Sequence, residues 1–346
     1  MSASAAAILR DRALGLVHQR FPALLSRNYR LYWVGQAISL IGTWMQTVAV
    51  GWLVWRISHS PFLLGLVGVC GMLPILAFSL LGGVVSDRFV RLRVILITQI
   101  LSMLQAFALA ALVTFGTPRV EVVLGLVAVM GVINAFDLPA RQSFLAETVD
   151  ADVLPNAIAL HSTIFNAARL LGPALAGLIL ATLGEAPCFW INAVTYLAVI
   201  FGLSRIQLPA RAPKAAAGSA VSHLREGLLY AWRTPRIRNL LILLGTAGSI
   251  GFQYTVLLPV YAGKILSVGA AGYGLLMSAG GVGSFFAAIA MTRSHDVWRL
   301  RRNLFIGMSL FGAGLFAFAF SRNYLLSVAL NLIVGFGMIL YAATTN

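Results

Sequence analysis

Polar side chains are rare inside the long apolar runs of this sequence, so each one is a candidate for chemistry. Arg169 is a charged residue deep within such a run, and Asp137 stands near the end of another. A cation in lipid needs an anion, a backbone carbonyl or water beside it. Two interpretations of Arg169 therefore fit: it contacts an anionic solute, or it forms a structural pair with Asp137 or Glu147.

Amide and hydroxyl groups inside apolar runs mark either a solute cavity or a contact between helices, because exposing them to lipid is costly. For each single group, an interhelical hydrogen bond is the alternative to a solute contact. The candidates for a solute cavity are Gln36, Gln46, Asn134, Asn166, Arg169, Gln253, Tyr254 and Asn331.

Other kinds of chemistry have little support in the sequence. The five histidines stand in loops or toward the ends of apolar runs, and no H-E-x-x-H pattern occurs. Cys70 and Cys188 lack the spacing of metal ligands. The glycine-rich stretch 280–283 lies inside an apolar run, so it predicts helix packing and not a nucleotide site. We expect no catalytic residue, no metal and no cofactor, and a membrane-embedded enzyme is the weaker alternative.

The elements that must position these residues are transmembrane helices. The chain is 60% hydrophobic and 10% charged, whereas soluble domains carry about 25% charged residues. A helix needs about 20 apolar residues to cross a bilayer, and lipid offers no other partner for the backbone. The ten predicted spans are 31–55, 64–85, 94–115, 122–138, 154–183, 187–204, 239–261, 270–292, 304–320 and 324–345.

The positions of Lys and Arg predict an orientation. With the N-terminus inside, most of the 25 basic residues fall in inner segments. The outer loops then hold only Arg56, Arg119, Lys264 and Arg322, which predicts a cytoplasmic N-terminus. Because the basic residues cluster in short loops, the net charge of +15 indicates a lipid bilayer as partner and not nucleic acid.

The expected organisation has four parts. Residues 1–30 form a cytoplasmic arm, residues 31–204 a six-helix half, residues 205–238 a basic cytoplasmic linker, and residues 239–346 an incomplete half of four helices. Two similar halves are typical of secondary transporters. Either the protein has ten helices, or two helices of the second half lie beyond this sequence, and we favour the second interpretation.

The loop between the second and third predicted spans carries a charge motif, GGVVSDRFVRLR, at residues 82–93. A glycine here lets two helices approach closely, and Asp87 is an anion that can cap a helix N-terminus. Arg91, one helical turn later, is expected to pair with Asp137. The predicted gating motif consists of Gly83, Asp87, Arg88, Arg91 and Asp137. A plain basic loop on the inner side is the alternative.

This loop resembles the signature G-x-L-A-D-[RK]-x-G-[RK]-[RK] of the major facilitator superfamily, with Gly83, Asp87, Arg88 and Arg91 at matching positions. Three further stretches resemble enterobactin-exporter-like facilitators, also called transmembrane secretion effectors. They are NYRLYWVGQ from residue 28, LPARQ from residue 138 and NAARLLGPALAG from residue 166.

The resemblance implies a major facilitator fold, in which two halves rock about a central cavity. It also implies secondary export of small amphipathic molecules, siderophore-like or drug-like, across a bacterial inner membrane. A proton as coupling ion is implied too, although no acidic residue lies near the middle of a predicted span. Gly172 and Pro173 match a Gly-Pro antiporter motif and predict a hinge, with a static kink as the alternative. A truncated, non-transporting protein of the same family is the main alternative function.

Overall fold

The computed structural model describes residues 21–208, 229–246, 253–291 and 297–345. These residues form helices and no strand, as the sequence predicts for an all-α membrane protein. Nine of the described helices are long and apolar enough to cross a membrane. The chain is therefore a multi-pass membrane protein in its architecture.

The first group of helices follows a short 3-10 turn, η1 (Pro22–Leu25). Its members are α2 (Arg27–Ser58), α3 (Pro61–Arg88), α4 (Arg91–Phe115), α5 (Val120–Leu145), α6 (Leu154–Leu183) and α7 (Ala186–Ser204). Each predicted span between residues 31 and 204 lies inside one of these helices, in order. Most ends differ by a few residues, and the largest difference is at the end of α5, which continues through Pro139 to Leu145 beyond the predicted end at residue 138.

The second group consists of α9 (Pro235–Thr246), α10 (Tyr254–Val260), the π-helical turn η3 (Tyr261–Ile265), α11 (Gly269–Met291), α12 (Val297–Phe320) and α13 (Tyr324–Thr345). The predicted span 239–261 includes residues 247–252, which lie outside the described residues. Its described parts are α9 from residue 239 onward and the whole of α10. Residues 1–20 of the predicted arm and 209–228 of the predicted linker also lie outside the described residues.

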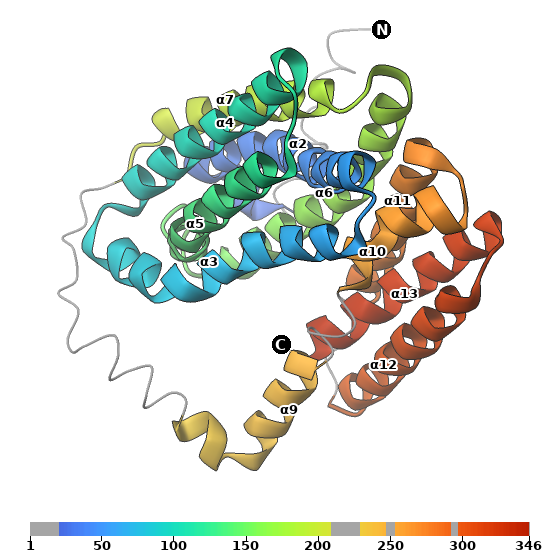
Figure 1. The fold of residues 1–346 in the computed structure, drawn as a ribbon. Coiled ribbons are helices and arrows are strands. Elements are labelled where there is room, and N and C mark those ends of the chain that lie inside the picture. The colour runs from blue at the N-terminus through green and yellow to red at the C-terminus, as the bar shows by residue number, and fades with distance from the viewer. Residues whose placement is uncertain (1–20, 209–228, 247–252, 292–296, 346) are drawn as a thin grey trace, which may run out of the picture.

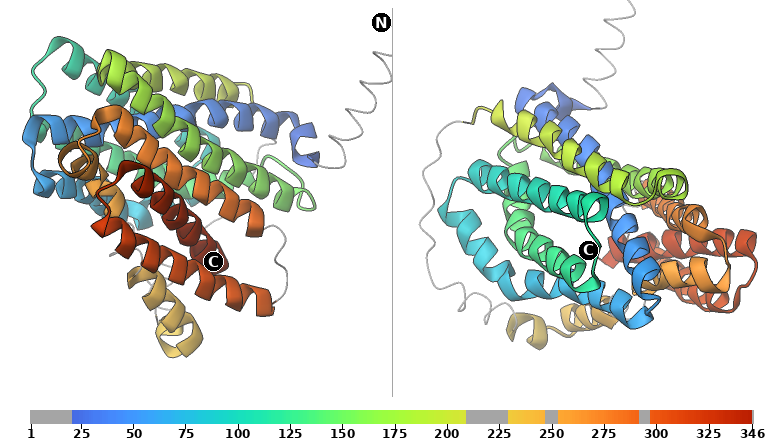
Figure 2. Two further views of the ribbon diagram at one scale, coloured as in Figure 1. Left: turned by 90° about the vertical axis from the view of Figure 1, so that its right-hand side faces the viewer. Right: turned by 45° about the horizontal axis from the view of Figure 1, so that its top comes forward.

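The two groups meet along α6 and α11, which pack side by side (Figures 1 and 2). Within the first group α2 packs on α6 and α7, α4 on α7, and α3 on α5. Within the second group α13 packs between α11 and α12, and α10 lies beside α3. In Figure 1, α9 lies apart from these helices, near the end of α13.

Small residues set the close helix crossings. A Cβ added to Gly177 on α6 would lie 2.7 Å from the Cα of Gly274 on α11, so a side chain at either position would push the two groups apart. Such close backbone approach is a common way for helices to pack in membranes, where burial of apolar surface gives no preference for protein over lipid.

Three prolines inside long helices have the same kind of neighbour, a glycine of an adjacent helix. Pro74 lies in α3, Pro139 in α5 and Pro173 in α6. A proline has no N–H, so it leaves the carbonyl four residues earlier without its helical donor. The freed carbonyls are those of Cys70, Ala135 and Arg169, and each faces a glycine of a neighbouring helix, Gly131, Gly82 and Gly281 respectively. The glycines let a second backbone lie against these polar atoms and shield them from lipid.

Candidate functional site

A cavity of about 640 Å³ lies between the two groups of helices. Its walls come from α2, α3, α5 and α6 on one side and from α10, α11 and α13 on the other, and α4 contributes Gln105. Binding sites for small molecules in proteins commonly have volumes of roughly 300 to 1,000 Å³. The cavity is therefore large enough for a solute of that class.

The cavity brings together polar residues that lie far apart in the sequence. Gln46 on α2, Asn134 on α5, Arg169 on α6, Tyr254 on α10 and Asn331 on α13 all line it. Each is one of the residues for which the sequence left a choice between a cavity and a helix contact.

The other three candidates lie elsewhere among the described residues. Gln36 is 1% exposed and accepts a hydrogen bond from Arg141. Asn166 donates to the carbonyl oxygen of Ser162, one turn earlier in its own helix, at 2.8 Å. Gln253 precedes α10 and is exposed, outside the cavity wall. For Gln36 and Asn166 the structure favours the helix-contact interpretation.

Gln46 belongs to a chain of buried amides along one wall. Its Nε2 donates to Oε1 of Gln105 at 3.0 Å, and its own Oε1 accepts from Nδ2 of Asn192 at 2.8 Å. Gln105 Nε2 donates in turn to the carbonyl oxygen of Leu126 at 3.1 Å. Because each amide has donors and acceptors assigned to partners, this chain fixes the orientation of the amides.

Arg169 carries the single charge of the described cavity wall. Its guanidinium carbon lies 5.6 Å from the ring centroid of Trp44, and Nη2 lies 3.8 Å from Sδ of Met338. Of the two interpretations of Arg169, the structural pair with Asp137 or Glu147 is not formed among the described residues. Those carboxylates bind Arg141 and Arg91 instead, because α5 and the following loop hold both acids away from α6.

Asn331 and Tyr254 both reach the cavity beside Gly280 of α11. A Cβ added to Gly280 would lie 3.4 Å from Nδ2 of Asn331 and 3.6 Å from the hydroxyl of Tyr254. Asn331 is 1% exposed, and its Nδ2 donates to the carbonyl oxygen of Leu276. Its Oδ1 has no hydrogen-bond partner among the described residues.

The rest of the wall is apolar and aromatic. Trp44 meets Phe165 edge to face at 5.8 Å between centroids, and Met72, Met130 and Met277 also line the cavity. Methionine side chains adapt to solutes of different shape. The described wall contains no Asp, Glu, His or Cys, and the described residues hold no group of three such side chains that could bind a metal ion.

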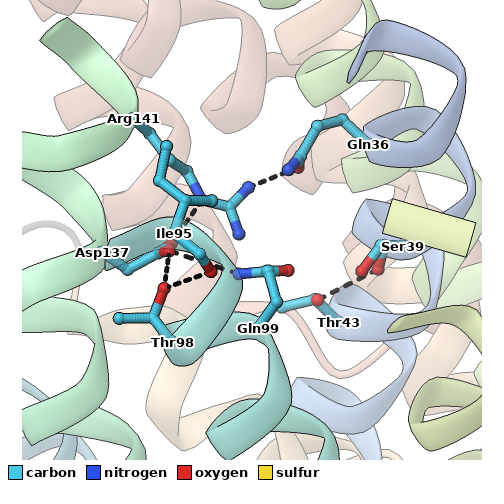
Figure 3. Close-up of polar contacts among 8 residues, drawn as sticks. All are labelled: Gln36, Ser39, Thr43, Ile95, Thr98, Gln99, Asp137 and Arg141. Carbon is cyan, nitrogen blue, oxygen red and sulfur yellow. Dashed lines mark hydrogen bonds and ion pairs between the residues drawn. The ribbon is translucent and has the colours of Figure 1, made fainter. Parts of the chain in front are cut away.

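A second polar cluster lies inside the first group of helices (Figure 3). Asp137 on α5 is 4% exposed and forms an ion pair with Arg141 one turn later. Asp137 Oδ1 also accepts hydrogen bonds from Thr98 Oγ1 at 2.5 Å and from Gln99 Nε2 at 3.2 Å. Arg141 reaches Gln36 on α2, so this cluster, which we call the inner network, connects α2, α4 and α5.

The loop motif differs from its expected pairing. Arg91 does not pair with Asp137, but its Nη1 lies 2.5 Å from Glu147 Oε1 and its Nη2 lies 3.5 Å from Asp87 Oδ1. Asp137 is satisfied by Arg141, which occupies the same face of α5 because the helix continues past Pro139. Asp87 has a side chain that is 58% exposed, and Arg88 is exposed at the end of α3.

The glycine of close approach in this motif is Gly82, not Gly83. A Cβ on Gly82 would collide with the carbonyl oxygen of Ala135 on α5, whereas a Cβ on Gly83 would meet nothing within 4 Å. Neighbouring helix positions differ by about 100° in direction, so only one of two adjacent glycines can face the partner helix.

The predicted hinge residues lie at a crossing of α6 with α2. A Cβ on Gly172 would lie 2.5 Å from Cβ of Trp44 and 3.0 Å from the carbonyl oxygen of Ile41. The helix α6 is continuous through Pro173. Gly172 is thus needed for packing, and a hinge at Pro173 stays a prediction.

Several members of these clusters are not among the site residues predicted from the sequence. Arg141, Thr98 and Gln99 complete the inner network, and Gln105 lines the cavity. The spacing of Asp137 and Arg141, four residues apart, is a signal for a pair on one helix face. The predicted span 122–138 includes Asp137 but not Arg141, so the pair does not appear within one predicted helix. Gln99 and Gln105 carried a visible signal, as amides within an apolar run.

The chain matches the family model described as transmembrane secretion effector over residues 19–346. Among curated proteins it is similar to the staphyloferrin A transporter of Staphylococcus aureus, with 26% identity over 314 residues. That match covers 88% of this chain and 77% of the relative. A multidrug efflux pump, Tap of Mycolicibacterium fortuitum, is 31% identical over 231 residues, which cover 64% of this chain and 56% of the pump.

Two solved structures share the fold at low identity. An inward-facing, unoccupied bacterial homologue of the human lysosomal transporter Spinster has a TM-score of 0.66 and 14% identity, covering 94% of this chain and 74% of that chain. A D-xylose–proton symporter has a TM-score of 0.60 and 18% identity, covering 93% and 80%. The fold assigned by resemblance is thereby confirmed as that of major facilitator transporters.

Proposed function

Because this chain belongs to the transmembrane secretion effector family, a family of major facilitator transporters, we propose that it exports small amphipathic molecules by alternating access. Siderophore-like and drug-like solutes are the proposed cargo. The observation that carries the proposal is the cavity between the two groups of helices, where polar side chains of both groups face one apolar space. A site shared by two rigid bodies changes its accessibility when those bodies rock against each other.

The relatives support the proposed cargo. One similar protein is named for transport of staphyloferrin A and another for multidrug efflux. The wall of this cavity fits such solutes, because aromatic and methionine side chains can pack against an apolar body while amides and Arg169 bind polar groups. We assign Gln46, Asn134, Arg169, Tyr254 and Asn331 to the solute site.

The inner network and the loop motif are proposed to stabilise one conformer. Hydrogen bonds from these residues join α2, α4 and α5, and the Arg91–Glu147 ion pair joins α4 to the loop before α6. Breaking or forming such pairs changes the relative stability of two conformers without a change in the fold. Asp87 is the exposed acid of the loop motif, and its charge is proposed to cap a helix N-terminus in one conformer.

A proton is the proposed coupling ion, with Asp137 as the carboxylate that responds to it. Asp137 is the described acid with the smallest exposure, and Arg141, Thr98 and Gln99 contact its carboxylate. Intramembrane carboxylates commonly serve as proton carriers. The test is export from proteoliposomes with and without an imposed pH gradient. Rates that do not change with the gradient would remove the proton from the proposal and leave export intact.

We further propose a bacterial inner membrane with a cytoplasmic N-terminus, on the basis of the basic inner loops. The measurement is fluorescence of a green fluorescent protein fused before residue 1 and, separately, inserted in the short loop after residue 116. The first fusion should fluoresce and the second should not. The opposite pattern would invert the orientation and every assignment of inner and outer ends.

The central experiment is flux through the purified chain in proteoliposomes loaded with a fluorescent amphipathic dye. We expect faster dye export than from dye-loaded liposomes that contain no protein. A matched pair of variants locates the path: Gly280→Leu places a side chain in the cavity beside Asn331, whereas Gly312→Leu on α12 meets open space. We expect the first variant to lose flux and the second to keep it. No flux from the original chain would favour a non-transporting member of the family.

A further inference from the structure

We propose that the cavity selects solutes that carry both an anionic oxygen group, bound by Arg169, and a hydroxyl or N–H donor, bound by Asn331. The inference rests on the proposed function, because it names the chemical class of solute that the same cavity would carry. For a cargo that is only amphipathic, neither the sign of its charge nor a hydrogen-bond donor would change its binding.

Arg169 is a cation in the cavity wall without a carboxylate partner among the described residues. Arg169 is the one charged residue of the described cavity wall, and none of the described carboxylates lies within ion-pair distance of it. Its contacts are the face of Trp44 and the sulfur of Met338. A ring face and a thioether stabilise a guanidinium only partly. A carboxylate or similar anion that enters the cavity would find its strongest partner here, through charge-assisted hydrogen bonds.

Asn331 Oδ1 is a buried acceptor without a hydrogen-bond donor among the described residues. Because Asn331 Nδ2 donates to the carbonyl oxygen of Leu276, the orientation of the amide is determined and Oδ1 is left as the free atom. Asn331 is 1% exposed and lines the cavity. A buried acceptor without a donor is costly, so a solute hydroxyl or N–H that reaches this oxygen removes that cost.

The two groups belong to one part of the wall. Gly281 packs against the backbone of Arg169, and Gly280, the adjacent residue of α11, faces Asn331 and the hydroxyl of Tyr254. Both residues therefore pack against adjacent positions of α11, and both line the same cavity. Trp44 and Phe165 line the same cavity and offer aromatic surface to the apolar body of the solute.

Four naphthalene probes separate these chemical features at nearly constant size. They are 6-hydroxy-2-naphthoate, 2-naphthoate, 2-naphthol and 2-(aminomethyl)naphthalene. Equilibrium dialysis against the purified full chain in nanodiscs measures their dissociation constants. We expect the hydroxy acid to bind tightest, then the acid, then the neutral naphthol, with the cation weakest. The acid should exceed the naphthol by roughly tenfold, as a hydrogen bond to a charged group predicts. A cation that binds as tightly as the acid would overturn the proposal.

Two variants assign the preferences to residues. Arg169→Gln should abolish the roughly tenfold advantage of naphthoate over naphthol. Arg322→Gln, at an exposed arginine outside the cavity, should keep this advantage. Asn331→Leu should make the hydroxy acid and the plain acid bind equally. An unchanged ratio in either cavity variant would contradict the assignment of that residue.

Thermal unfolding separates binding from a structural role for Arg169. If the cation is uncompensated, Arg169→Gln should unfold at the same temperature as the original chain or higher, and naphthoate should raise the midpoint of the original chain only. A lower midpoint for Arg169→Gln without ligand would indicate a structural partner and contradict the proposal.

Flux measured in parallel distinguishes the two proposals. Export of naphthol and of the cationic probe at the rate of the acids would refute the selectivity and leave the transporter standing. Anion-selective binding without any flux would refute export and leave the assigned site standing. Export of the hydroxy acid that exceeds export of naphthol in the original chain, and loses this advantage in Arg169→Gln, is the expected result.

Discussion

Asp137 and Arg141 form the most buried ion pair among the described residues, with side chains 6% and 18% exposed. Removing one partner of such a pair leaves the other charge uncompensated, which typically costs about 3 to 5 kcal/mol. We therefore expect Asp137→Asn to lower the free energy of unfolding by about that amount, measured by titration with SDS in mixed micelles. The double variant Asp137→Asn/Arg141→Met should recover most of the loss. Wild-type stability of the single variant would show that Arg141 does not depend on this carboxylate.

Asp87 is expected to show the opposite behaviour, a functional effect without a loss of stability. Its ion pair with Arg91 spans 3.5 Å at an exposed position, and such pairs contribute about 0 to 1 kcal/mol. Asp87→Asn should therefore unfold like the original chain but export far more slowly, because the charge is proposed to favour one conformer. Dye export and the amount of protein in the membrane are measured together. Asp152→Asn, at another exposed acid, is the control, and normal export by Asp87→Asn would remove Asp87 from the gating motif.

Helix crossings in this protein depend on which glycine faces a neighbour. Gly82→Ala on α3 would bring a methyl group onto the carbonyl oxygen of Ala135, whereas Gly83→Ala has free space. Overpacking of this kind costs about 1 to 3 kcal/mol. We expect a clear drop in the thermal midpoint of the first variant and none in the second. Equal midpoints would mean that α3 and α5 adjust to the added methyl group, and that the freed carbonyl does not require this contact.

The internal prolines explain why the ends of helices were harder to predict than their cores. Pro139 is a helix breaker in water, but in α5 its freed carbonyl, that of Ala135, lies against Gly82. The sequence analysis ended the span at residue 138, and so it separated Asp137 from Arg141. In a membrane, a helix can continue through a proline when a neighbouring helix packs against the freed carbonyl and shields it from lipid.

The two groups of helices meet where Gly177 of α6 faces Gly274 of α11. Alternating access requires them to stay together and to rock at this crossing. Gly274→Val should wedge the groups apart, lower the thermal midpoint and abolish dye export. Gly65→Val on α3, where a Cβ would meet nothing within 4 Å, is the matched control and should keep both. Normal export by Gly274→Val would show that the proposed rocking does not need this close approach.

At the scale of the whole molecule, long apolar runs with few charges were sufficient to predict a helical membrane protein. This class follows from composition and periodicity, because lipid permits few ways to satisfy a backbone. The loop motif at 82–93 and the stretches around Arg141 and Arg169 were sufficient to predict the family, which the match over residues 19–346 confirms. Among the candidate residues, Gln46, Asn134, Arg169, Tyr254 and Asn331 line the cavity.

The tertiary structure alone decided the partners. Arg91 pairs with Glu147, and Asp137 pairs with Arg141. Arg169 has no acidic partner among the described residues. Gly82, and not Gly83, lies at the crossing of α3 and α5. The physical reason is that burial in lipid depends on residue type, which the sequence states directly. Pairing depends on the rotation and register of helices about one another, and one residue of register turns a side chain by about 100°.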